Sequence, residues 1–170
     1  MLPIVLDPTA IRIGVAGHGE GLKRRLDLLA KAGVNQISVF DGRIPSSDEL
    51  AGLAVLFVAG FDIDRSRELA TAARSAGTLI NVEDEPDLCD FHVPASLRRG
   101  DLLFTVSTAG QSPGLARLLR EGLEQHFGPE WSERIAEIAR SRSDWRAAGI
   151  DPVGVSERTR ALVKAKGWVP

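Results

Sequence analysis

Short apolar runs recur along the first two thirds of the chain and alternate with longer stretches of mixed polarity. Each run is rich in Val, Ile, Leu or Phe and is bounded by Gly, Asp or Pro, and most have apolar side chains at successive positions. Such runs are typical of strands that are buried on both faces of a parallel sheet. The pattern therefore predicts five strands, at residues 12–16, 36–40, 54–59, 78–82 and 102–107.

Stretches with helical spacing lie between these runs. Residues 20–32 carry leucines at i, i+4 and i+7, and residues 64–76 place small residues on one face. A glycine that can end a helix follows each stretch, at Gly33 and Gly77. The alternation predicts an α/β fold with a Rossmann-like parallel sheet and right-handed crossovers. The link at residues 41–53 is near the minimum length for a parallel crossover and leaves room for only a brief helix.

The pattern changes after residue 107, because residues 112–127 and 131–147 carry apolar side chains at helical spacing. We therefore predict two parts, a Rossmann-like domain at residues 1–111 and a helical region at residues 112–170. An apolar helical stripe on a small appendage often packs against a second subunit, so a homodimer is favoured. Packing of the stripe on the parent sheet is the alternative.

Composition narrows the class of protein. The chain has 170 residues, of which 44% are hydrophobic and 26% charged, which is typical of a globular protein rather than a disordered one. A net charge of -2 provides no field that would recruit nucleic acid. The single cysteine, Cys89, excludes an intrachain disulfide and a multi-cysteine metal site. Residues 1–7 lack the features of a secretory signal, and no apolar stretch is long enough for a membrane span, so we expect a cytoplasmic protein.

A glycine-rich loop joins the first predicted strand to the first predicted helix. Residues 17–22 read Gly-His-Gly-Glu-Gly-Leu and fit the dinucleotide-binding pattern G-x-G-x-x-G/A at two of its three positions, with Leu22 at the third. Glycines permit a tight turn and the close approach of a pyrophosphate, and the free amides of a helix N-terminus can hold its phosphates. A plain tight turn is the alternative interpretation.

Asp41 ends the second predicted strand about twenty residues after this loop, where a carboxylate can accept hydrogen bonds from ribose hydroxyls and would repel a 2′-phosphate. This position favours NAD over NADP as the cofactor of residues 1–111. A capping aspartate in a structural turn is the alternative. The predicted cofactor-binding residues are Gly17, His18, Gly19, Glu20, Gly21, Asp41, Gly42 and Ala59.

An acidic segment follows the fourth predicted strand. Residues 83–90 contain five carboxylates and no basic residue, so their mutual repulsion is costly. Ligands of open α/β sheets bind beyond the carboxyl ends of the strands, which is where this segment is expected to lie. A carboxylate that is crowded there and partly buried would have a raised pKa and could move a proton. An exposed acidic turn is the alternative.

A turn rich in hydroxyl groups follows the fifth predicted strand. In residues 107–113, Ser112 is expected to cap a helix that starts at Pro113. The hydroxyls and free amides of this turn could bind carboxylates, and neighbouring arginines could add two-point contacts to such groups. Ordinary solvated arginines are the alternative. The arginines in question are Arg98, Arg99, Arg117 and Arg120.

Taken together, these motifs resemble those of the precorrin-2 dehydrogenase family, the dehydrogenase and ferrochelatase modules of siroheme synthesis. The resemblance covers most of residues 1–125, and residues 81–117 are its specific part. The motifs that carry it are Met1-Leu2-Pro3-Ile4, the glycine loop followed by Arg24-Arg25, residues 81–91, Pro94, Arg99-Gly100-Asp101-Leu102, and residues 107–113 followed by Leu115-Ala116-Arg117.

The resemblance implies an NAD-dependent oxidation of precorrin-2 to sirohydrochlorin by a homodimer, with Fe²⁺ insertion in some members. It implies that Asp84 is the essential catalytic aspartate and that Ser107 and Thr108 belong to the substrate-binding turn. Arginines would then meet the carboxylates of the tetrapyrrole. The substrate-binding residues predicted in this way are Ser107, Thr108, Gly110, Ser112 and Arg117.

Several positions depart from the family pattern. Leu22 and Asp41 stand where relatives often have small residues, and Gly60-Phe61-Asp62 replaces a Thr-Asp pair. These departures keep open a non-catalytic module that binds NAD or a tetrapyrrole, and a dehydrogenase that acts on an unrelated acid is a third possibility.

The histidines and the cysteine, which could bind a metal or act as a nucleophile, do not form a motif in the sequence. The histidines His18, His92 and His126 have no metal-ligand spacing, so no metal site is predicted in the protein, and Cys89 is interpreted as a small buried residue rather than a nucleophile.

Overall fold

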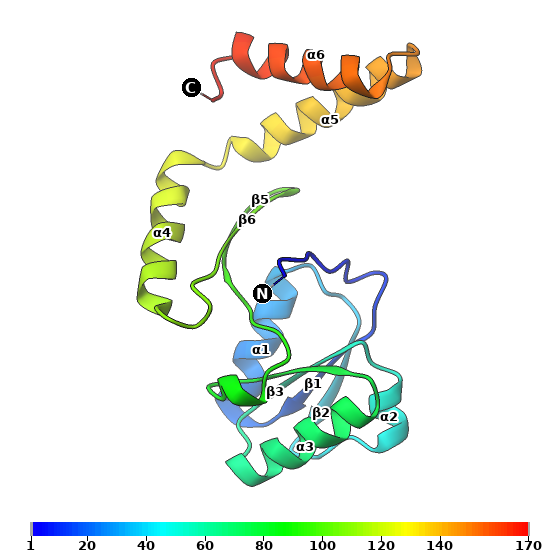
Figure 1. Cartoon of the computed structure of the whole chain (residues 1–170), viewed down its shortest axis with the longest axis vertical. Coiled ribbons are helices and arrows are strands. Elements are labelled where there is room, and N and C mark those ends of the chain that lie inside the picture. Colours follow the sequence, from blue (N-terminus) through cyan, green and yellow to red (C-terminus); the bar gives the residue numbers. More distant parts are fainter. Residues whose placement is uncertain (1, 170) are drawn as a thin grey trace. The chain divides into compact units, whose positions relative to one another are not determined.

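A computed structural model describes residues 2–169, which form two compact units (Figure 1). The first unit ends at Val93 and the second begins at Pro94. This boundary differs from the predicted division after residue 111. The reason is that residues 95–106 form a hairpin of their own and pack against the helix that follows it.

The first unit is built on one parallel sheet in the order β2-β1-β3-β4. Its strands are β1 (Ile13–Gly17), β2 (Ile37–Asp41), β3 (Val55–Ala59) and β4 (Leu79–Val82). The two central strands, β1 and β3, are buried at every residue, which explains their successive apolar positions. The first four predicted strands and the Rossmann-like fold are thus confirmed. The chain places β2 on one side of β1 and β3 on the other, so the winding direction changes between β1 and β3.

Helices cover both faces of this sheet. They are α1 (Gly19–Lys31), α2 (Ser47–Ala51), α3 (Ile63–Ser75) and the short 3₁₀ helix η1 (Pro86–Leu88). Alternate residues of β3 face two separate apolar clusters, because side chains alternate along a strand. Val55 packs in one cluster with Leu29 of α1, and Leu56 packs in the other with Leu69 of α3.

The brief helix expected between β2 and β3 is α2, which has five residues. Its first turn is a capping box, in which the Ser46 hydroxyl accepts from the Glu49 amide at 3.4 Å and the Glu49 carboxylate accepts from the Ser46 amide at 2.8 Å. The same carboxylate accepts hydrogen bonds from both outer nitrogens of Arg43, at 2.7 and 2.9 Å. This combination holds the pKa of Glu49 at about 2, and the hydrogen bond from Arg43 is the largest cause.

The second unit begins with an antiparallel hairpin of β5 (Ala95–Arg99) and β6 (Leu102–Val106). The fifth predicted strand is therefore real, but its placement in the parallel sheet is wrong, because it pairs with a strand that the apolar pattern did not indicate. Three helices follow, α4 (Pro113–His126), α5 (Trp131–Ala147) and α6 (Pro152–Ala165). The helical end of the chain is thus confirmed.

Aromatic side chains connect the hairpin of this unit to its helices. The Phe127 ring lies 4.4 Å from that of Phe104 on β6 and 5.2 Å from that of Trp131 on α5, measured between ring centroids. Such aromatic clusters bury a large apolar area in a small unit. Within residues 2–169, none of the helices is both long enough and apolar enough to cross a lipid bilayer.

The ion pair of Glu49 predicts a dependence of stability on pH. The folded-state pKa of Glu49, about 2, lies below its ordinary value of 4.5, so the charged carboxylate stabilises the folded state above pH 4.5. This contribution is lost as the pH falls from 4.5 towards 2. Glu49→Gln should therefore lower the urea midpoint of unfolding at pH 6 more than at pH 3, since Gln can still complete the capping box. An equal decrease at both pH values would contradict this explanation.

Candidate active site

The carboxyl ends of the parallel strands meet at one edge of the first unit. Gly17 ends β1 and is paired in register with Asp41 of β2 on one side and Ala59 of β3 on the other. This is also the point at which the winding direction of the sheet changes, where ligands of open α/β sheets bind. The predicted cofactor-binding residues, 17–21, 41, 42 and 59, therefore lie together along this edge.

Two loops touch here, and their contact requires glycine. A Cβ atom on Gly17 would collide with the carbonyl oxygen of Ala59. Gly60 has φ +82°, and a Cβ atom there would lie 2.6 Å from the carbonyl oxygen of His18. The His18 amide also donates to the Ala59 carbonyl at 3.3 Å. The β1–α1 loop and the β3–α3 loop are thus held against each other by backbone atoms.

Free donors lie at the start of α1. Among the described residues, the amides of Gly19, Glu20 and Gly21 have no backbone acceptor, and His18 provides no side-chain cap. Gly19 has φ +60°, and the space where its side chain would lie is open. The Glu20 carboxylate is turned to Lys23, 2.7 Å away, which offsets its negative charge. An anion can therefore be received by these amides and by the helix dipole.

Leu22 does not obstruct this loop. Its side chain is buried in the apolar cluster between α1 and the sheet, together with Val15 and Leu29. The bulky residue at the third position of the glycine pattern thus supports the packing of α1 and leaves the turn at Gly19 open. The residues present fit a dinucleotide phosphate group.

Asp41 is exposed at the end of β2. The amide of the next residue, Gly42, donates to the Gly17 carbonyl at 2.8 Å, which fixes the end of β2 against the glycine loop. Gly42 has φ +66°, so the chain turns sharply there. Asp41 is consequently held beside the loop with its carboxylate in solvent, as a ribose-binding residue requires.

A pocket opens at the same edge, between the ends of β3 and β4. Asp84, two residues beyond the end of β4, lines it together with Arg24 of α1 and Gly60 of the β3–α3 loop. Asp84 has φ +61°, a left-handed conformation that Asp adopts more readily than most residues. Its side chain is exposed rather than partly buried. The remaining lining residues are Ala59, Phe61, Ile63, Ser66, Val82, Glu83 and Glu85.

Basic residues from α1 neutralise the start of the acidic segment. The Glu83 carboxylate lies 2.9 Å from Arg24 Nη2 and 3.9 Å from Arg25 Nε. The side chains of Glu83 and Arg25 are only 18% and 13% exposed. The hydrogen bond to Glu83 raises the pKa of Arg24. Arg24 is therefore held at the pocket with its guanidinium charged.

Contacts with α3 and β4 anchor the other end of the segment. The Asp90 carboxylate accepts from Arg74 Nε at 2.8 Å and from the Ile80 amide at 3.1 Å. Cys89 Sγ accepts from the Val82 amide at 3.2 Å. Burial raises the pKa of the Cys89 thiol, which agrees with a structural rather than a nucleophilic cysteine. The repulsion expected in the acidic segment is thus offset by arginines from two helices.

The hydroxyl-rich turn lies in the second unit, where its side chains build the turn itself. Ser107 accepts from the Ala109 amide at 3.3 Å, Thr108 from the Ser112 amide at 3.1 Å, and Ser112 from the Leu115 amide at 3.3 Å. Ser112 is the N-cap of α4, as predicted. Each hydroxyl still has its own O–H to donate, since in these contacts it acts as an acceptor. Gly110 has φ +79° at the tip of the turn.

The arginines of the second unit differ in their exposure and in their partners. Arg99 is largely buried, and its Nε donates to the Phe127 carbonyl at 2.9 Å, so it supports the fold of this unit. Arg117 is exposed and lies 2.9 Å from Glu121, one turn along α4. Arg120 pairs in the same way with Glu124 at 2.8 Å. Arg117 therefore stays available at the surface, whereas Arg99 does not.

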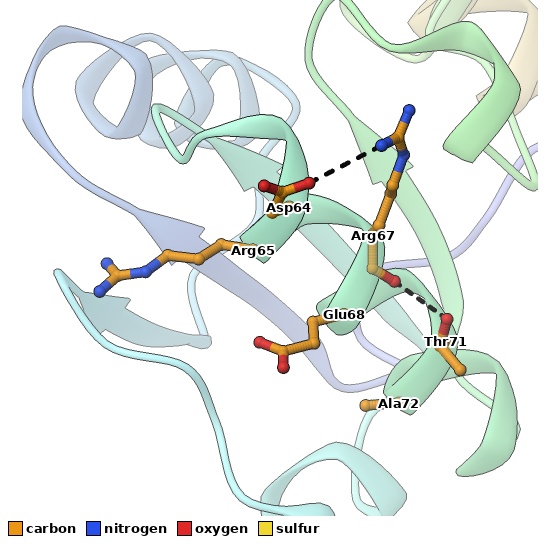
Figure 2. A pocket seen from close by; sticks show the side chains of 6 residues that line it. All are labelled: Asp64, Arg65, Arg67, Glu68, Thr71 and Ala72. Carbon is orange, nitrogen blue, oxygen red and sulfur yellow. Dashed lines mark hydrogen bonds and ion pairs between the residues drawn. The ribbon is translucent and has the colours of Figure 1, made fainter.

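A second depression lies on the exposed surface of α3 (Figure 2). Its polar groups bond to one another: Arg67 lies 3.7 Å from Asp64, and the Thr71 hydroxyl donates to the Arg67 carbonyl at 3.0 Å. Arg65 and Glu68 point away from this pair in Figure 2. None of the predicted site residues lines this depression.

No group of three or more His, Cys, Asp or Glu side chains within residues 2–169 is placed to hold a metal ion. His18 packs edge-on against Phe61, with ring centroids 5.6 Å apart, and His126 Nδ1 lies 2.9 Å from the Gly122 carbonyl. These two histidines are thus engaged in local contacts.

Sequence reasoning did not assign a role at the site to Arg24, Glu83 or Gly60. The position of Glu83 directly after β4 was a usable signal, because residues beyond the carboxyl ends of strands line the site. Arg24 is brought there by the first turns of α1, and its pairing with Glu83 is a tertiary contact that spacing along the chain does not indicate.

The contacts of Glu83 predict a specific loss of stability. Glu83→Ala should lower the free energy of unfolding by about 1–3 kcal/mol, because it removes the hydrogen bonds from Arg24 and the carboxylate that lies beside the largely buried Arg25. Glu85→Ala is the matched control, since Glu85 lies on the same segment and has no ion pair within 4.0 Å among the described residues. Urea unfolding monitored by circular dichroism measures both, and equal losses would contradict the role of Glu83.

Comparison with known proteins agrees with this geometry. Residues 4–95 match a protein family described as "Putative NAD(P)-binding". The chain is 34% identical over 163 residues to the siroheme synthase of Methylococcus capsulatus, which covers 85% of this chain and 34% of that protein. It is 44% identical over 92 residues to the siroheme synthase of Nitrosomonas europaea, which covers 54% of this chain and 19% of that protein. The chain therefore spans about a third of the first relative and about a fifth of the second.

A solved structure has the same fold. SirC, a precorrin-2 dehydrogenase, superposes with a TM-score of 0.73 over 96% of this chain and 89% of that chain, at 17% sequence identity. The family match covers more than half of the chain, whereas the siroheme synthases and SirC are similar in sequence and in fold, respectively. The chain belongs to the family described as "Putative NAD(P)-binding".

Proposed function

We propose that this protein is an NAD-dependent dehydrogenase that oxidises precorrin-2 to sirohydrochlorin in siroheme biosynthesis. The observation that carries the proposal is the common sheet edge, at which the glycine loop and the pocket lined by Asp84 both open. The names of the relatives, siroheme synthase and precorrin-2 dehydrogenase, support the choice of substrate.

The cofactor is proposed to bind along this edge. The amides of Gly19, Glu20 and Gly21 would hold its phosphates, and Asp41 would accept hydrogen bonds from its ribose. The exposed negative charge of Asp41 disfavours a 2′-phosphate, which makes NAD the proposed form. When bound, the nicotinamide supplies the hydride acceptor of the reaction.

The oxidation removes two hydrogens from the macrocycle, one as a hydride and one as a proton. Asp84 is proposed to accept the proton, and its exposure lets the proton pass on to solvent. Arg24, held at the pocket by Glu83, is proposed to bind a carboxylate of the tetrapyrrole. A role of Ser107, Thr108, Gly110, Ser112 and Arg117 in substrate binding stays a prediction, as does Fe²⁺ insertion.

A homodimer is part of the proposal. Leu115, Leu118 and Leu119 form an exposed apolar stripe on α4, at positions i, i+3 and i+4. Exposed stripes of this kind commonly mark subunit interfaces. The stripe is the surface that we assign to the second copy.

The proposed chemistry predicts the effect of one substitution. Mixing the wild type with precorrin-2 and NAD⁺ should produce NADH, and Asp84→Asn should slow this by about 10²-fold or more, as expected for the loss of a general base. Asp87→Asn is the control, because Asp87 lies on the same segment and does not line the pocket. Circular dichroism checks that both variants fold.

If the wild type produces no NADH, the proposed dehydrogenase activity is rejected. Calorimetry then distinguishes the remaining candidate, since tight binding of NAD or tetrapyrrole without turnover would identify a non-catalytic binding module.

The proposed dimer interface predicts that a charge on the apolar stripe of α4 lowers the mass of the particle in solution. Leu118 is 66% exposed, so Leu118→Glu should leave the fold of the second unit intact and shift the protein from dimer to monomer in sedimentation equilibrium. Ser143→Glu adds the same charge to an exposed position of α5 and should leave the dimer unchanged. A wild type that sediments as a monomer would reject the assignment.

A further inference from the structure

Arg43 lies two residues after Asp41, and its guanidinium is already engaged. Nη1 donates to Glu49 Oε2 at 2.9 Å and Nη2 donates to Glu49 Oε1 at 2.7 Å. The guanidinium carbon also lies 4.8 Å from the centre of the Phe40 ring. The ion pair with Glu49 of α2 and the contact with the Phe40 ring of β2 together hold the guanidinium of Arg43 in place.

Glu49 is itself held in place. One of its oxygens accepts from the Ser46 amide at 2.8 Å, which ties the carboxylate to the start of α2. Because the pKa of Glu49 is about 2, the carboxylate is charged at neutral pH. The hydrogen bond to Glu49 raises the pKa of Arg43, so both partners of the pair carry their charges.

The neighbouring Asp41 has no such partner. Within the part of the chain that the structure describes, no ion pair within 4.0 Å includes Asp41, and its side chain is exposed beside the glycine loop. The charges of Arg43 and Glu49 cancel each other. Asp41 therefore presents an uncompensated negative charge at the end of β2, where a dinucleotide carries its adenosine ribose.

This arrangement bears on the distinction between two cofactors. NAD carries a free 2′-hydroxyl that a carboxylate can bind, whereas the 2′-phosphate of NADP is commonly accommodated by an arginine near the end of this strand. Arg43 is an arginine at such a position, and its outer nitrogens are occupied by Glu49.

We propose that Glu49 is a positioning residue that sets the cofactor specificity, because it withholds Arg43 from the 2′-phosphate of NADP. The inference rests on the proposed binding of a dinucleotide at this edge. It assigns the preference for NAD to a pair of residues on the link between β2 and β3, in addition to Asp41.

Glu49→Gln tests this role while preserving the helix cap, since Gln can accept from the Ser46 amide in a capping box. Isothermal titration calorimetry at pH 7 on the full chain should give a Kd for NADP⁺ about tenfold lower than that of the wild type, as expected for one released charge-assisted contact. The Kd for NAD⁺ should change by less than about twofold.

Two further variants isolate the cause. Arg43→Ala/Glu49→Gln should lose the gain in NADP⁺ affinity, because the released guanidinium is absent. Asp48→Asn removes one negative charge from the same helix without touching the pair, and its Kd for NADP⁺ should equal that of the wild type. Circular dichroism at pH 7 verifies that each variant is folded.

The outcomes separate this inference from the function on which it rests. A wild type that binds neither NAD⁺ nor NADP⁺ would reject the proposed cofactor, and the inference with it. A wild type that binds NAD⁺, with no gain in NADP⁺ affinity in Glu49→Gln, would overturn the inference alone. It would also be overturned if the gain persisted without Arg43, or if Asp48→Asn reproduced it.

Discussion

The close contact between the β1–α1 and β3–α3 loops is the constraint on which the site depends. The carbonyl oxygens of Ala59 and His18 occupy the space that side chains on Gly17 and Gly60 would need, so the two loops approach through backbone atoms. This approach leaves the first amides of α1 free and directs the loop after β3 towards the pocket that contains Asp84. Side chains at either glycine would force the loops apart and separate the glycine-rich turn from that pocket.

The parallel core could be predicted from the sequence because burial on both faces leaves a strong local signal. Runs such as residues 54–59 are apolar throughout, which indicates a strand buried on both faces. The spacing of the glycines in residues 17–21 indicates a tight turn between a strand and a helix. The fifth strand could be recognised, but its partner could not. The sequence of β5, Ala-Ser-Leu-Arg-Arg, has one buried residue, Leu97, so apolar periodicity does not indicate a strand there.

The acidic segment illustrates why part of the site lies beyond sequence reasoning. In the sequence alone, its carboxylates are close together without basic neighbours, so their repulsion suggests a functional role such as ligand binding. In the fold, Glu83 and Asp90 meet arginines that are far away in sequence, on α1 and α3. Local composition contains no information on these pairings, because they depend on how each helix packs against the sheet. For the same reason, the sequence did not indicate that Arg99, which was considered as a residue that could bind a carboxylate, donates to the Phe127 carbonyl and supports the second unit.

The anchoring of the acidic segment also bears on the order of assembly. One end is bound to α1 through Glu83 and the other to α3 through Asp90, and these helices cover opposite faces of the sheet. The left-handed turn at Asp84 lies between the two anchors. A partly folded chain with only one helix docked would retain one anchor and lose the geometry of this turn. Competence of the site therefore requires that both helices are docked on the sheet, so a loss of packing on either face would be felt at the turn that carries Asp84.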